Sequence, residues 1–236
     1  MTNTDKIKIF ILIVIAISSS ILIYNVAAPK GNKKDDVVKS DALKFKEEYE
    51  KYNNTKDASG QEYINVSIDE DNIMYYASFD EIKELLTSGT GVIYFGIPMC
   101  PWCRNAVPVL VNAASSTGLD KIYYFNAYEI RDKKSLDEDG KIITEKEGTK
   151  EYYELVSLLQ GVLPVYDGLN DENIKRLYFP TVIFVRDGKI VGTHMDTVSS
   201  QENPLVPLND EQTKELTNIY VSNIMKVLDD ACDKSC

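Results

Sequence analysis

Val92-Ile93-Tyr94-Phe95-Gly96, followed by Cys100-Pro101-Trp102-Cys103, is the stretch that decides the fold of this 236-residue chain. The apolar run is typical of a short strand that is buried on both faces of a sheet. The residues after it, from about Pro101 to Ser116, have a helical pattern that stops at Gly118. Two thiols separated by two residues at a helix start can close and reopen a disulfide, and the helix N-terminus favours a thiolate on the first. The stretch therefore predicts redox chemistry.

The sequence on either side predicts alternating strands and helices over residues 61–236. Ser78 and Glu81 have the spacing of a capping box in front of a helix. Asp187-Gly188 between two apolar runs indicates a hairpin. Together the patterns predict an α/β sandwich with one antiparallel edge. The expected strands lie at 63–68, 73–76, 92–96, 121–127, 178–185 and 190–193, and the expected helices at 79–87, 101–116, 150–160 and 210–231.

The N-terminal part of the chain contains a strongly apolar segment. Residues 9–28 carry no charge, and Lys6 and Lys8 precede them. A run of about 20 apolar residues is long enough to cross a bilayer as a helix. We expect a cytoplasmic N-terminus at 1–8, a single-pass transmembrane anchor at 9–28, and the following domain outside the cytoplasm. A cleaved signal peptide is the alternative, because Val26-Ala27-Ala28 resembles a cleavage site, although the proline directly after it disfavours cleavage.

Charge and composition exclude some partners. The formal net charge is −11, with 37 acidic and 26 basic residues, which argues against nucleic acid and against an anionic membrane surface as partners. Residues 29–60 are polar and rich in lysine and aspartate. We expect a spacer there, with one exposed helix at about 41–52. Four cysteines are too few for a disulfide scaffold, so the domain must fold on its hydrophobic core.

Several motifs in this order resemble the thioredoxin superfamily. Cys100-Pro-Trp-Cys103 follows a predicted buried strand, and Arg104 comes where many thioredoxins have a basic residue. Pro108 lies where a proline kinks the active-site helix of the family. Phe179-Pro180-Thr181, followed by a hairpin at Asp187-Gly188, is similar to the family's cis-proline segment. A CxxC motif alone is a weak signal, but all of these features in the right order are specific.

The resemblance covers about residues 73–232 and implies a three-layer sandwich, in which a mixed central sheet has helices on both faces. The chain departs from the family at two places. Thioredoxins have a buried aspartate six residues before the first cysteine, where this chain has Tyr94. Residues 131–177 are longer than the corresponding segment and indicate an insertion. With the predicted anchor, this organisation is similar to bacterial cell-surface thioredoxin-like accessory proteins, including those associated with bacteriocin export.

The candidate site residues have distinct expected roles. Cys100 is the expected nucleophile, because free N–H groups and the helix dipole stabilise a thiolate at a helix start. Cys103, one turn later, is expected to attack the mixed disulfide. The resemblance implies a cis bond before Pro180 and a Phe179 backbone that pairs with a substrate strand. Trp102 either grips a substrate peptide or tunes the disulfide. Three further residues are expected to support the motif. Pro101 lies in the first helical turn, and Pro108 lies inside the same helix. Arg104 is expected either to add positive charge near the thiolate or to be solvated.

Other titratable residues leave alternatives open. His194 is the only histidine, and it admits a cysteine–histidine hydrolase, although a surface position is the simpler expectation. Glu129 and Asp132 follow a predicted strand. They are candidates for the proton acceptor that replaces the missing aspartate, or else they are simply exposed.

The two terminal cysteines allow three interpretations. Cys232 and Cys236 are spaced i, i+4, which places them on one face of a helix. We expect a second disulfide in an oxidising compartment. A redox relay with Cys100 and Cys103 is less expected, and a four-cysteine zinc site least of all, although zinc accepts that ligand set. We therefore expect no metal and no cofactor.

The function expected from this sequence is that of a membrane-anchored thiol–disulfide oxidoreductase. Its partners would be protein thiols and disulfides, together with a redox partner in the membrane. The alternative is a non-catalytic thioredoxin-like accessory protein or chaperone that binds a secreted peptide. The two differ in whether both cysteines of the CPWC motif are needed.

Overall fold

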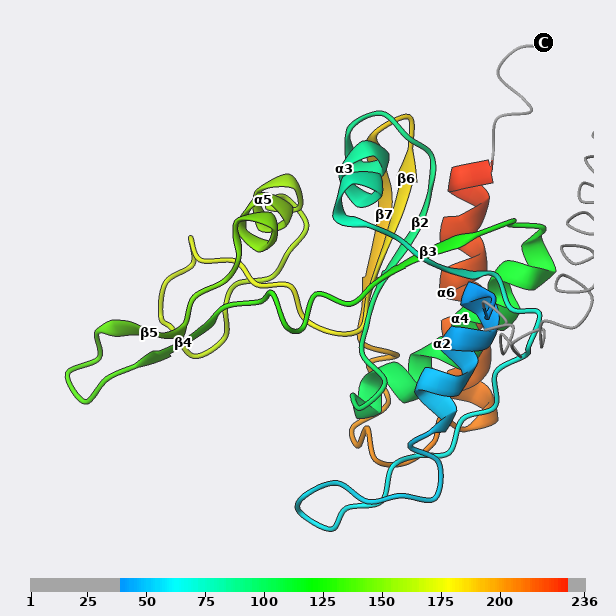
Figure 1. Ribbon diagram of the computed structural model, residues 1–236, viewed down its shortest axis with the longest axis horizontal. Coiled ribbons are helices and arrows are strands. Elements are labelled where there is room, and N and C mark those ends of the chain that lie inside the picture. The colour runs from blue at the N-terminus through cyan, green and yellow to red at the C-terminus, as the bar shows by residue number, and fades with distance from the viewer. Residues whose placement is uncertain (1–38, 229–236) are drawn as a thin grey trace, which may run out of the picture. The chain divides into compact units, whose positions relative to one another are not determined.

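The computed structural model describes residues 39–228 (Figure 1). The predicted anchor at 9–28 and the cysteines at 232 and 236 lie outside these residues. Within 39–228, none of the helices is both long enough and apolar enough to cross a membrane.

A mixed sheet of five strands forms the centre of the domain, in the order β1-β3-β2-β6-β7. The first three strands in this order are parallel, and β6 and β7 complete the sheet in antiparallel pairing. This confirms the predicted α/β class with a mixed sheet. The strands are β1 (Met74–Tyr76), β2 (Gly91–Phe95), β3 (Ile122–Phe125), β6 (Thr181–Arg186) and β7 (Lys189–Met195).

Helices pack on the two faces of this sheet (Figure 1). Helix α4 (Pro101–Thr117) packs against α6 (Asp210–Leu228), and α6 contacts β2, β6 and β7. Helix α3 (Phe79–Thr87) contacts β3 and β7 and lies on the other side of the sheet in Figure 1. The predicted capping box is confirmed, because Ser78 and Glu81 satisfy each other's backbone N–H groups at the start of α3. All residues of β2 are buried, as its continuous apolar sequence predicts.

Helix α2 (Asp41–Glu50) corrects the prediction of a spacer over residues 29–60. The helix was expected to be exposed, but Phe45 and Tyr49 are fully buried in the core. They lie one turn apart, so both face the sheet, and Phe45 packs edge-on against Tyr124 of β3, with ring centroids 4.9 Å apart. Because α2 supplies core residues, residues 41–50 belong to the folded domain and not to a spacer.

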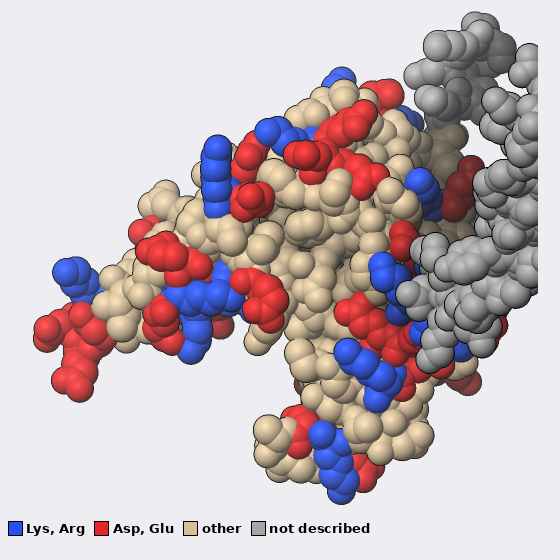
Figure 2. Space-filling view, viewed as in Figure 1, with Lys and Arg blue, Asp and Glu red and all other residues tan. Residues whose placement is uncertain are grey.

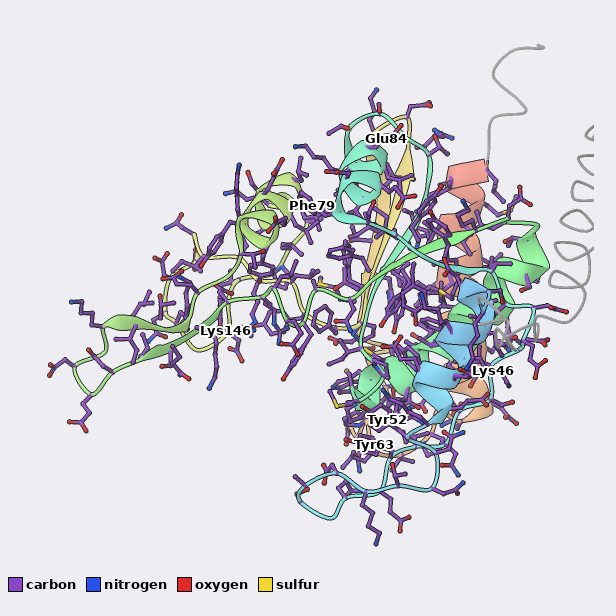
Figure 3. The ribbon with its side chains drawn as sticks, in the orientation of Figure 1. Lys46, Tyr52, Tyr63, Phe79, Glu84 and Lys146 are labelled. Carbon is purple, nitrogen blue, oxygen red and sulfur yellow. The ribbon has the colours of Figure 1, made fainter. Side chains whose placement is uncertain are left out.

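Residues 63–68 do not form the predicted strand. Their alternation is real, since Val66 and Ile68 are buried. However, side chains from the end of α2 bond to this backbone in place of a neighbouring strand. Asn53 exchanges two hydrogen bonds with Val66, of 2.7 and 2.9 Å, and Glu50 accepts one of 2.8 Å from the N–H of Ile68. The rings of Tyr52 and Tyr63 also pack together at a tilt, with centroids 5.1 Å apart (Figure 3).

The segment at 131–177, predicted as an insertion, forms a structure of its own beside the five-stranded sheet (Figure 1). Strands β4 (Lys133–Leu136) and β5 (Ile142–Lys146) pair in a separate antiparallel sheet. Helix α5 (Lys150–Leu158) follows and contacts α3. Tyr152 and Leu155 of α5 belong to the buried core. The segment is therefore anchored through α5, while its hairpin reaches outward.

Candidate active site

The CPWC motif lies where β2 passes into α4. Cys100 is the N-cap residue of α4, and Pro101 occupies the first turn, where a missing N–H costs nothing. The backbone N–H of Cys103 donates to the Cys100 Sγ at 3.4 Å. The pKa of Cys100 lies below that of an ordinary thiol, because Cys103 donates a side-chain hydrogen bond and the N–H groups of Cys103 and Trp102 also bond to the sulfur. Cys100 therefore has the features of a nucleophilic thiol.

The segment around Pro180 faces the same sulfur. The Phe179–Pro180 peptide bond is cis, as the resemblance implies. The thiol of Cys100 donates to the carbonyl oxygen of Phe179 at 3.4 Å, although the two residues are far apart in the sequence. The carbonyl of Pro180 accepts a 3.0 Å hydrogen bond from the N–H of Asp196, directly after β7. The loop before β6 is therefore held beside the start of α4 by the sheet.

Cys103 is fully buried behind Cys100. Its pKa is raised well above the ordinary value, because burial disfavours the thiolate and because Cys100 accepts its hydrogen bond and places a charge beside it. The structure holds both cysteines as free thiols. The arrangement therefore has one partly exposed, reactive thiol and one fully buried thiol behind it.

Tyr94 lies on β2, six residues before Cys100. It is fully buried, and its hydroxyl is 2.9 Å from that of Tyr49 in α2. Interaction with the Tyr94 hydroxyl lowers the pKa of Cys103, against the larger effects of burial and of Cys100. Burial raises the pKa of Tyr94 itself well above 10, so at neutral pH this hydroxyl is a donor and not a base. The sequence does not predict that Tyr49 belongs to the site, because this residue lies in the segment that was predicted to be a spacer.

Gly96 makes room for this tyrosine pair. A Cβ atom at residue 96 would lie 2.1 Å from the hydroxyl oxygen of Tyr94. Since real Cβ contacts are never that short, any other residue here must displace the hydroxyl. Gly96 therefore leaves the space that the Tyr94 hydroxyl occupies.

Arg104 does not have either of its predicted roles. It is 1% exposed, so it is not solvated, and its guanidinium bonds to backbone and not to the thiolate. It donates to the carbonyls of Ile64 (2.6 Å), Tyr49 (2.8 Å) and Pro98 (3.0 Å) and to the side chain of Asn53 (2.7 Å). Arg104 lies on α4. Its hydrogen bonds thus connect α4 to the end of α2, to the 63–68 segment and to the loop that precedes the CPWC motif.

The remaining predicted residues of the motif have the expected positions. Trp102 is partly exposed in the first turn of α4, beside both cysteines. Pro108 lies inside α4 and is partly buried. Phe179 is 8% exposed and Pro180 is buried, so the backbone carbonyl of Phe179, rather than its ring, is the group that faces the reactive sulfur.

Asp196 is the acidic residue whose charge affects the pKa of Cys100, and the sequence analysis did not identify it. The negative charge of Asp196 raises the pKa of Cys100, against the effect of the hydrogen bonds. Glu129 and Asp132, the predicted candidates, instead pair with Lys146 at 3.9 Å and with Lys134 at 3.8 Å. Asp196 has a φ of 59° after β7, and its proximity to Cys100 depends on strand pairing that no local pattern reveals.

His194 is partly buried, and its contacts are structural. It lies on β7, its Nε2 is 2.7 Å from the carbonyl oxygen of Thr197, and its ring packs edge-on against Tyr220 of α6. Burial lowers its pKa. A structural role therefore accounts for its contacts.

No group of three or more histidine, cysteine, aspartate or glutamate side chains that could hold a metal ion occurs between residues 39 and 228. The predicted pairing of Cys232 and Cys236 falls outside this range. Comparison with protein-family models and with curated proteins finds no match to this chain.

Proposed function

We propose that this protein is a membrane-anchored, thioredoxin-like thiol–disulfide oxidoreductase that exchanges disulfides with extracytoplasmic protein substrates. The observation that carries the proposal is the geometry around Cys100. Its sulfur lies at a helix N-terminus with a lowered pKa, 3.4 Å from the Phe179 carbonyl oxygen before the cis bond, and Cys103 lies buried behind it. A substrate strand that pairs with this segment would bring its own sulfur to Cys100.

The reaction needs only these two thiols and the substrate disulfide. In the reductive direction the thiolate of Cys100 attacks one substrate sulfur, the substrate disulfide breaks, and the departing substrate thiolate takes up a proton. Cys103 then loses its proton to solvent and attacks the sulfur of Cys100, which breaks the mixed disulfide and releases the second substrate thiolate. Two electrons pass to the substrate, and a Cys100–Cys103 disulfide remains. The oxidative direction is the reverse, and a redox partner in the membrane would restore the starting state.

The pKa of Cys103 supports this order of steps. Two of the causes that raise it, after burial, are its hydrogen bond to Cys100 and the charge of Cys100. Both causes disappear once Cys100 is part of a mixed disulfide, because the sulfur then carries no charge. The donor effect of Tyr94 remains. Cys103 therefore becomes easier to ionise at the step where its thiolate is needed.

The location outside the cytoplasm rests on the sequence. The uncharged run at 9–28 has the length of a membrane span. With the anchor at the N-terminus, the domain would work close to the membrane surface, on substrates that fold there.

The test is disulfide exchange by the full-length chain in detergent, measured with a peptide whose disulfide joins a fluorophore to a quencher. We expect Cys100→Ser to abolish turnover and Cys103→Ser to accumulate a mixed disulfide with the peptide. The double variant Cys232→Ser/Cys236→Ser is a matched control and should keep the activity. If Cys100→Ser exchanges disulfides as fast as the unmodified chain, the proposal is wrong, and the non-catalytic accessory protein is the better description.

A further inference from the structure

A cleft lies beside the cis-proline segment, between the residues that lead into β4 and the loop that follows α5. Its volume is about 560 Å³. Figure 2 shows basic and acidic side chains gathered on this part of the molecule. The lining residues are Tyr128, Glu129, Arg131, Asp132, Lys133, Lys134, Lys146, Tyr166 and Arg176.

Two arginines in this cleft have no acidic partner among the described residues. The lysines of the cleft do have one each: Lys133 pairs with Glu145, and Lys134 and Lys146 pair with Asp132 and Glu129. No such pair is formed by Arg131 or Arg176 within 39–228. In a chain with a net charge of −11, two unpaired guanidinium groups in one cleft are a local positive site.

Aromatic rings hold both guanidinium groups in place. The Arg176 group lies over the ring of Tyr166, 4.0 Å from its centroid. The Arg131 group lies over Phe179 at 4.8 Å and donates a 3.1 Å hydrogen bond to the carbonyl of Leu177. Stacked guanidinium groups lose little freedom on binding and keep their N–H edges open to a carboxylate. Burial is the largest cause that lowers the pKa of Arg176, and the positive charge of Arg131 is the next. The two guanidinium groups therefore repel each other, and an anion bound between them would reduce this repulsion.

The same cleft contains an unsatisfied acceptor. Asp132 is 5% exposed, and its Oδ1 has no hydrogen-bond partner in the described part of the chain. A buried carboxylate oxygen without a donor is unfavourable. The occupant of the cleft should therefore offer a donor as well as an anion. An extended peptide with an acidic side chain offers both, through its backbone N–H and its carboxylate.

The cleft is connected to the reactive sulfur through a single residue. The ring of Phe179 stacks on Arg131, and the carbonyl oxygen of Phe179 is 3.4 Å from the Cys100 Sγ. A polypeptide that pairs with the Phe179 backbone therefore passes within reach of Arg131 and Arg176.

We propose that the cleft binds an acidic segment of the substrate polypeptide, with a carboxylate between Arg131 and Arg176 and a backbone N–H donated to Asp132 Oδ1. This inference rests on the proposed disulfide exchange and names its substrate class: proteins with aspartate or glutamate near the reacting cysteine. The insertion at 131–177 is then the part of the domain that selects substrates.

The test compares two disulfide-linked fluorogenic peptides that differ only in glutamate or glutamine at the positions that flank the cysteine. With the full-length chain we expect the glutamate peptide to have a kcat/KM about tenfold higher at low salt, and we expect the difference to shrink at high salt. Arg176→Gln should remove the preference. Arg186→Gln is the matched control, since it removes the same charge from the far end of β6, and it should keep the preference.

Each result decides the inference. Equal rates for the two peptides with the unmodified chain overturn it, and this comparison does not depend on any variant folding. A second arm measures anisotropy of the labelled glutamate peptide bound to the Cys100→Ser variant, which cannot exchange disulfides. Binding that Arg176→Gln weakens supports the cleft even if turnover is absent and the proposed function fails. If millimolar inorganic phosphate displaces the peptide completely at constant ionic strength, the cleft is a small-anion site and the inference is wrong.

Discussion

The substitution Tyr94→Phe tests how Cys103 is activated without a buried carboxylate. It removes one oxygen atom and keeps the ring that stacks on Tyr124, with centroids 5.7 Å apart. The substitution removes the hydrogen bond to the Tyr49 hydroxyl and the interaction that lowers the pKa of Cys103. The packing of the core stays nearly the same, so the main effect should fall on the buried thiol.

The size of the effect follows from the energy of the hydrogen bond. A bond to a charged group contributes about 1.5–3 kcal/mol, and about 1.4 kcal/mol corresponds to one pKa unit. The pKa of Cys103 should therefore rise, and its thiolate fraction at neutral pH should fall by about 10- to 100-fold. A thiolate of higher pKa is also a better nucleophile, with a Brønsted coefficient of about 0.4–0.5, so the net loss in rate is about 3- to 16-fold.

The assay isolates the step in which Cys103 attacks. Cys100 is first converted to a mixed disulfide with a fluorescent peptide at low pH, and release of the peptide is then followed by stopped flow across a pH series. Tyr94→Phe should slow release at neutral pH and shift its midpoint to higher pH. The matched control is Tyr124→Phe, because the buried Tyr124 hydroxyl has no hydrogen-bond partner among residues 39–228. Unchanged release by Tyr94→Phe, or an equal loss in Tyr124→Phe, would refute the role of the hydroxyl.

Three further predictions concern stability and ionisation. Arg104→Met should lower the free energy of unfolding by about 3–5 kcal/mol, because the buried oxygen atoms that accept hydrogen bonds from the guanidinium lose their donor. Urea unfolding measures this free energy, and a decrease of less than about 1 kcal/mol contradicts the prediction. Asp196→Asn removes a charge that raises the pKa of Cys100, so the pH midpoint of Cys100 alkylation by iodoacetamide should fall; an unchanged or higher midpoint rejects this. Burial lowers the pKa of His194 in the folded protein, so as the pH falls the unfolded chain takes up a proton on this histidine before the folded chain does. The contribution of neutral His194 to stability is therefore complete above the unfolded pKa of about 6.5 and is lost as the pH falls below that value. His194→Gln should therefore show a weaker fall in melting temperature between pH 7 and 5 than the unmodified chain, and parallel curves would show that the histidine is not responsible.

The elements that the sequence predicts well are those with local causes. The capping box at Ser78 and Glu81 places the start of α3, and Cys100 and Gly118 bound α4 as N-cap and left-handed C-cap. The continuous apolar run of β2 predicts its burial on both faces, and Asp187-Gly188 predicts the β6–β7 hairpin. Each of these signals acts within a few residues, so a single sequence is enough to recognise it.

The wrong predictions share a different cause. The segment 63–68 alternates like a strand, but Asn53 and Glu50 bond to its backbone. Helix α2 has a polar sequence with few large apolar residues, and only Phe45 and Tyr49 are buried. In both cases the outcome depends on which distant residues reach the segment, and hydrophobic periodicity carries no information about that.

The CPWC motif at a helix start, the buried strand before it and the proline segment that faces it can all be read from the chain, because spacing and short-range preferences encode them. The surroundings of the two sulfurs depend on how the distant segments pack. The packing of the helices on the sheet brings Tyr49 of α2 to Tyr94 and buries Arg104, whose guanidinium donates to backbone carbonyls. It also brings the charge of Asp196 close enough to affect Cys100, and it forms a cleft beside Phe179 that contains two unpaired arginines. The physical reason is that burial and charge act through space, between residues that only the packed sheet and helices bring together.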